Sequence, residues 1–172
     1  MRDHAWDGGR LTVELYVRSL APRVGHERLD TVVDRLDHLA STGYLADFTV
    51  RITGDEIPAT PADAVSETGA FLSRRVSSFE SWASRTGRSL DASFERRIVA
   101  SGIIGQTHTA IVPPMIAMAE FLDGDVRYVS PCSDSHGQVS VEDRLTSMES
   151  AATGQESDVA SRRLSEPRTT GR

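Results

Sequence analysis

The chain has 172 residues, enough for one domain with a hydrophobic core, and carries a net charge of −6. All 19 of its basic residues are arginine. The single cysteine, Cys132, excludes an intramolecular disulfide and a four-thiolate zinc site built from one chain. No apolar run approaches the roughly 20 residues that span a bilayer, and the start of the chain lacks the apolar segment of a secretory signal. We therefore expect a cytoplasmic protein without a membrane partner.

The first third of the chain predicts a strand, a helix and a second strand. Apolar and polar residues alternate over residues 11–20, the period of a strand. Residues 26–40 carry one apolar stripe at helical spacing that includes Leu29, Val33 and Leu36. Residues 45–52 alternate again. Because this spacing is that of a βαβ unit, we expect the two strands to be parallel and the helical stripe to pack on their sheet.

The middle of the chain predicts a second helix and a third strand. Thr60 suits the N-cap of a helix that begins at Pro61, and Gly87 suits its C-terminal end. A strand is expected over residues 93–99. Further on, the Pro113-Pro114 pair must lie at a strand start, an edge or a bulge, because proline cannot donate to a sheet ladder.

The last elements are a hairpin and a short helix. Asp123-Gly124 is a typical hairpin turn, and residues 126–129 form the returning strand. Ser140 and Asp143 resemble a capping box at the start of a helix over residues 140–150.

These elements predict one α/β domain. Their order is β-α-β-α-β-β(-β)-α, which fits a thioredoxin-like or ferredoxin-like sheet with helices packed on it. The domain should span residues 11–150, after a flexible N-terminus at residues 1–10. We expect a disordered tail over residues 151–172, where apolar residues are few.

Three folds share parts of this pattern. Residues 112–121 with Asp123-Gly124 resemble the cis-proline strand and hairpin of thioredoxin-like proteins, but the loop at residues 19–23 lacks the CxxC motif of redox members. The segment 45–55 is similar to the second strand of ferredoxin-like ligand-sensing domains. Residues 35–50 resemble a recognition helix that leads into the wing strand of a winged helix, although a strand stands where that motif needs its first helix.

Taken whole, the chain resembles a family of small, uncharacterised haloarchaeal proteins that are often labelled helix-turn-helix domain proteins. The segments VELYVRSLAP, DFTVRITGDEIP and FLDGDVRYVSPCSD carry this resemblance. It implies a transcription-related, non-enzymatic role with DNA as partner. The alternative is a catalytically degenerate thioredoxin-like module that binds another protein or a second copy of itself. We expect no cofactor in either case.

Arginines flank the loop between the first strand and the first helix. An anion or a DNA phosphate there would meet the helix N-terminus and several guanidinium groups. The candidate residues are Arg18, Arg23, Arg28 and Arg35. The alternative is a solvated helix face, because aspartates interleave with these arginines.

A second candidate site follows the last strand. Cys132, Asp134 and His136 lie close together in sequence, and His108 could complete a mixed metal site. Cys132 could also act as a nucleophile beside a histidine. The C-x-D-x-H spacing is not that of a structural zinc site, so a polar loop with a structural thiol is the alternative to both.

Overall fold

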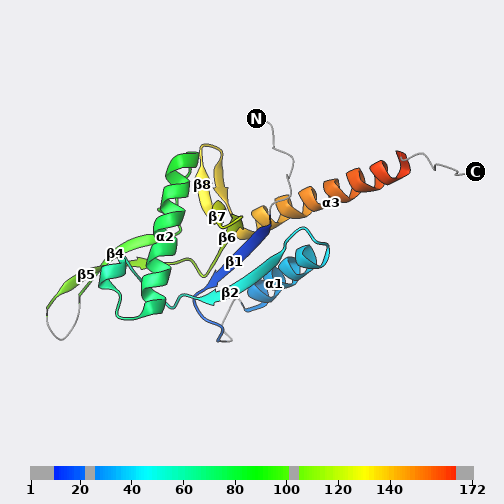
Figure 1. The fold of residues 1–172 in the computed structure, drawn as a ribbon. Coiled ribbons are helices and arrows are strands. Elements are labelled where there is room, and N and C mark those ends of the chain that lie inside the picture. Colours follow the sequence, from blue (N-terminus) through cyan, green and yellow to red (C-terminus); the bar gives the residue numbers. More distant parts are fainter. Residues whose placement is uncertain (1–9, 22–25, 101–104, 166–172) are drawn as a thin grey trace, which may run out of the picture.

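The main sheet has four strands in the order β2-β1-β6-β7 (Figure 1). The computed structural model describes residues 10–21, 26–100 and 105–165. Within these ranges β1 (Leu11–Val17) pairs in parallel with β2 (Asp47–Ile52) and antiparallel with β6 (Ile116–Leu122). Helix α1 (His26–Ser41) connects β1 to β2. The predicted βαβ unit and its parallel pairing are therefore confirmed, and the protein has the predicted mixed α/β class.

The sheet is covered by helices on both faces. Alternate residues of β1 point to opposite faces, so Leu11, Val13, Leu15 and Val17 join one core cluster and Tyr16 joins the other. The first cluster contains the apolar stripe of α1 and the start of α3 (Val141–Ser165). The second contains the apolar stripe of α2 (Glu67–Thr86). Leu36 at 0% exposure confirms that the α1 stripe is interior.

The predicted hairpin closes the sheet. Strand β7 (Asp125–Ser130) pairs antiparallel with β6. Asp123 and Gly124 join the two strands with φ values of 52° and 92°, the left-handed conformations of a tight hairpin turn. The Pro113-Pro114 pair lies between β5 (Thr107–Val112) and β6, next to a strand start as expected. The thioredoxin-like resemblance implies a cis-proline in the segment 112–121. Among the described residues the cis peptide bond precedes Pro131 and lies outside that segment.

A smaller sheet extends from the body (Figure 1). It contains β3 (Ile57–Pro58), β5 and β4 (Glu95–Ala100) in the order β3-β5-β4, and all its pairings are antiparallel. A two-stranded hairpin of β8 (Cys132–Asp134) and β9 (Gly137–Val139) follows β7.

The predicted start of the second helix was wrong. Pro61 begins only the single 3-10 turn η1 (Pro61–Asp63), and α2 starts at Glu67 with Ser66 as N-cap. The reason is local, because the Thr60 hydroxyl donates to the Asp63 carboxylate at 2.7 Å and caps no backbone N–H. The predicted end is confirmed, since Gly87 has φ 69° and closes the helix.

The last helix begins as predicted and runs further. The Asp143 N–H donates to the Ser140 hydroxyl at 3.0 Å and the Ser140 N–H donates back at 2.9 Å, which confirms the capping box. Helix α3 continues to Ser165, so residues 151–165 are helical where the sequence predicts disorder. A stretch with few apolar residues can still be helical when it contains alanines and no proline, as this one does.

Candidate nucleic-acid interface

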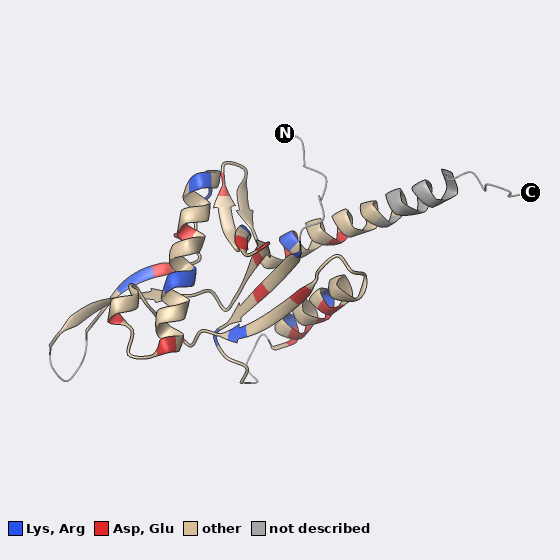
Figure 2. Ribbon diagram, viewed as in Figure 1, with Lys and Arg blue, Asp and Glu red and all other residues tan. Residues whose placement is uncertain are grey.

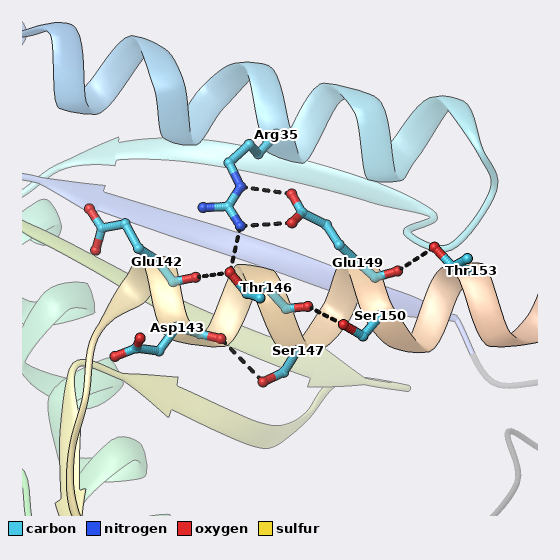
Figure 3. A network of polar contacts seen from close by, with 8 residues as sticks. All are labelled: Arg35, Glu142, Asp143, Thr146, Ser147, Glu149, Ser150 and Thr153. Atoms are coloured by element: carbon cyan, nitrogen blue, oxygen red, sulfur yellow. Dashed lines mark hydrogen bonds and ion pairs between the residues drawn. The ribbon is translucent and has the colours of Figure 1, made fainter.

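The arginines predicted from the sequence bind other parts of the protein. Arg28 forms a bidentate ion pair with Glu142 on α3. Arg35 forms a second bidentate ion pair, with Glu149, in which both N–O distances are 2.7 Å. Arg35 also donates to the Thr146 hydroxyl at 3.0 Å (Figure 3). These hydrogen bonds hold the pKa of both glutamates below the usual value. The two arginines thus fasten α1 to α3.

The other two predicted arginines lie apart from this contact. Arg18, just past the end of β1, donates its Nε to the Pro113 carbonyl at 2.7 Å. Arg23 lies outside the described residues. Around α1 the charge is negative, since residues 26–41 contain two arginines and four acidic residues.

The four candidate metal ligands do not form a cluster. No three His, Cys, Asp or Glu side chains in the described part of the chain are placed to hold a metal ion. Cys132 is buried, and its thiol donates to the Tyr128 hydroxyl at 3.7 Å. Asp134 accepts the His136 backbone N–H at 2.8 Å, and His108 is exposed on β5. Burial raises the pKa of the Cys132 thiol, which does not favour a nucleophilic thiolate.

Positive charge gathers instead on α2 and β4 (Figure 2). Residues 67–100 contain six arginines and four acidic residues, a net charge of +2 in a chain of net charge −6. The net negative charge of the whole chain repels a polyanion. A polyanion would therefore bind most favourably at a region of net positive charge such as this one.

Helix α2 follows η1 after a turn of three residues, Ala64, Val65 and Ser66. It is the one place in the described ranges where two helical elements succeed one another without a strand between them. Val65 in the turn is fully exposed. A helix-turn-helix joins two helices through a turn of three or four residues, so α2 has the connection of a second helix, while η1 is a single 3-10 turn of three residues.

The outer face of α2 combines cations with hydroxyl groups. From Arg74 onward the exposed residues of one side are Arg74, Ser77, Ser78, Ser81 and Arg85, and the exposed Glu67 lies two turns before Arg74 on the same side. Arg85 donates its Nε to the Ser81 carbonyl at 3.4 Å, and Arg74 has no acidic partner among the described residues. Arginine and serine are both common donors to phosphate oxygens.

The inner face holds the helix rigidly in place. Phe79 and Trp82 are almost completely buried, and the Trp82 indole N–H donates to the Arg127 carbonyl at 2.8 Å. Burying two large aromatic side chains anchors α2 to the sheet, so its outer face has a fixed orientation.

A charged cluster supports the first half of α2. Glu14 on β1 accepts hydrogen bonds from Arg75 at 2.9 Å, from Arg51 at 3.1 Å and from Tyr16. Both guanidinium groups also lie over the Phe71 ring. Burial alone would raise the pKa of Glu14, but the Tyr16 hydrogen bond and the two arginines outweigh it and hold that pKa below the usual value. One carboxylate here faces two cations, so the cluster is net positive.

The β4–β5 hairpin stands beside α2. Arg96 on β4 pairs with Glu80 on α2 at 2.7 Å, and Arg97 pairs with Glu95 at 3.1 Å. Ile98 is 79% exposed further along the strand. The hairpin therefore presents arginine and an apolar residue to solvent at one side of α2.

Neither Arg74 nor the outer face of α2 is among the candidate sites predicted from the sequence. A signal was present in the sequence, because the side of α2 opposite its apolar stripe is rich in arginine and serine. The sequence pattern did not show that this helix follows a short turn, because that depends on where η1 ends.

The fold and this surface define an α/β protein with a basic helix beside a hairpin. Residues 7–153 match the model of a family described as a helix-turn-helix domain, and the chain belongs to that family. Membership suggests a DNA-binding regulatory role. No curated protein and no solved structure matches the chain. None of the described helices is long and apolar enough to cross a membrane.

Proposed function

We propose that this protein is a non-enzymatic, DNA-associated regulator that presents the outer face of α2 to the duplex, with the β4–β5 hairpin beside it. In a helix-turn-helix the second helix lies in the major groove. The observation that carries the proposal is the outer face of α2, where Arg74 and Arg85 flank three serines from the third turn of the helix onward.

Helix α2 suits this role better than α1. The acidic residue in the middle of α2, Glu80, is bonded to Arg96 and so does not oppose a phosphate freely. On α1, by contrast, acidic residues outnumber arginines, and both arginines are held by glutamates of α3. Strand β2 is also paired in parallel with β1, so it does not fold back on α1 as a wing.

The test is the salt dependence of DNA binding. Fluorescence anisotropy with a labelled duplex of mixed sequence gives the affinity of the full chain over a series of salt concentrations. Each arginine that neutralises a phosphate contributes about 0.9 to the slope of log affinity against log salt. We expect the double variant R74A/R85A to bind more weakly and to lose up to about 1.8 of that slope.

The matched control is Arg10→Ala, which removes an exposed arginine before β1. It should leave the slope almost unchanged. Equal losses in the control and in R74A/R85A would mean diffuse attraction without an α2 interface. Absence of binding at every salt concentration would reject the proposal.

A second candidate, a thioredoxin-like scaffold without CxxC, is favoured by a different observation. The Arg18 N–H donates to the Met115 carbonyl at 3.3 Å, so the segment after Pro113-Pro114 lies beside the end of β1. A cleft of about 340 Å³ opens there, lined by residues that include Arg18, Pro113 and Cys132. This function predicts that extended peptides shift the NMR signals of the cleft residues. A titration in which only α2 signals respond, and only to DNA, would reject it.

A further inference from the structure

Strand β2 forms one open edge of the main sheet. The strand order of the sheet, β2-β1-β6-β7, places β2 at one end, and no described strand pairs with the outer side of β2. Val50 is 37% exposed and Ile52 is 50% exposed on the face that α1 covers only in part. An exposed edge strand with apolar residues, without proline, is a template for pairing with another strand.

The backbone of β2 has free groups in the right places. Successive residues of a strand direct their N–H and C=O groups alternately to the two sides. The Thr53 N–H donates to the Val17 carbonyl, so the groups of Thr49 and Arg51 face β1 and those of Phe48 and Val50 face outward. The outward Phe48 N–H is bonded only to its neighbour, the Asp47 carboxylate, at 2.9 Å.

Strand β2 is complementary to itself in one antiparallel register. With Thr49 opposite Thr49 of a second copy, Asp47 stands opposite Arg51 and Phe48 opposite Val50, twice each. Opposite charges and apolar pairs across two strands both stabilise pairing. The outward-facing backbone groups of Phe48 and Val50 then fall in the hydrogen-bonded positions. Arg51 is bonded to Glu14 but its side chain is still 36% exposed, which leaves it accessible to a second carboxylate.

We propose that the protein forms a two-fold symmetric dimer through antiparallel pairing of β2 with β2 of a second copy, which joins the two main sheets into one. The pairing is isologous, so it closes at two chains and does not continue into a fibre. It is independent of the proposed function, although a two-fold axis would also duplicate α2, as in dimeric DNA-binding proteins.

Disulfide trapping of the full chain tests both the pairing and its register. In this register Thr49 forms a non-hydrogen-bonded pair with itself, with Cα atoms about 4.5 Å apart, which a disulfide can bridge. We expect Thr49→Cys to become a covalent dimer under mild oxidation, and Val50→Cys to do so far less. The native Cys132 is buried, and Cys132→Ser in both variants removes any contribution from it.

The second measurement is the dimer dissociation constant, obtained by sedimentation of proteins without an introduced cysteine. Asp47→Arg sets like charges opposite each other twice, and we expect it to raise the dimer dissociation constant about tenfold. The matched control is Asp125→Arg on β7, the opposite edge of the same sheet, which should leave the dimer intact. A monomer at all concentrations, a dimer lost only through Asp125→Arg, or trapping through Val50→Cys in place of Thr49→Cys would each overturn the proposal.

Discussion

Arg144 on α3 holds the carboxylate of Glu120 in the middle of β6 through two hydrogen bonds, one of them at 2.8 Å. Glu120 is 1% exposed, and the Arg144 guanidinium also lies 4.0 Å from the centre of the Tyr128 ring. A buried charge is tolerated only when it is paired and hydrogen-bonded, so this pair is a condition for docking α3 on the sheet.

We expect Arg144→Ala to lower the free energy of unfolding by about 3–5 kcal/mol, because it leaves the Glu120 carboxylate buried without a partner. Urea denaturation followed by circular dichroism measures this. The double variant E120L/R144M should recover most of the loss, since replacing both partners leaves no orphaned charge. Arg97→Ala, which breaks a fully exposed pair, serves as control, and a loss as large as that of Arg144→Ala would contradict the interpretation.

The ion pairs between α1 and α3 should make stability depend on acidity. The pKa values of Glu142 and Glu149 are lowered in the folded protein by hydrogen bonds from Arg28 and Arg35. Groups of this kind stabilise the fold above the unfolded pKa of 4.5, and the stabilisation is lost as the pH falls through the folded value.

The double variant E142Q/E149Q should therefore be less stable than the parent at neutral pH, and the difference should shrink as the pH falls below about 4.5. Urea denaturation at a series of pH values measures the difference. A difference in the free energy of unfolding that stays constant down to low pH would show that the pKa values of these glutamates are the same in the folded and unfolded states.

Arg35 is expected to matter for packing and not for DNA. Arg35→Gln breaks the contact with Glu149, so the amide hydrogens of α3 should exchange faster. The DNA affinity of the folded variant should equal that of the parent. If its affinity falls as far as that of R74A/R85A, the nucleic-acid surface includes α1, as the sequence first indicated.

Cys132 should be chemically inert in the folded protein. Its side chain is buried, and burial raises the pKa of its thiol, so little thiolate is present or accessible at neutral pH. We expect a thiol reagent such as Ellman's reagent to react slowly in buffer and rapidly in urea. Rapid reaction in buffer would instead support the nucleophilic alternative.

Features that depend on neighbouring residues could be predicted from the sequence. The alternation in β1 and the stripe of α1 follow from the periods of a strand and a helix, and both are confirmed. The Asp123-Gly124 turn and the Ser140 capping box depend on two to four residues each, and they too are confirmed. The predicted start of α2 was wrong even so. Thr60 bonds to the side chain of Asp63, and the helical turn that begins at Pro61 ends at Asp63.

The candidate site could not be derived in the same way. Arg28 and Arg35 look free in the sequence, but their partners lie 114 residues further along the chain. Three of the four candidate metal ligands, Cys132, Asp134 and His136, are close in sequence, but the described part of the structure brings no three such side chains together around a metal position.

The sequence by itself determined the α/β class, the parallel βαβ start and the hairpin of this protein, because short-range periodicity and turn chemistry specify them. Only the tertiary structure decided which arginines are consumed by ion pairs and which face of which helix remains open to a partner. The physical reason is that the charge available to a partner depends on what packs beside each side chain, and those neighbours come from distant parts of the chain.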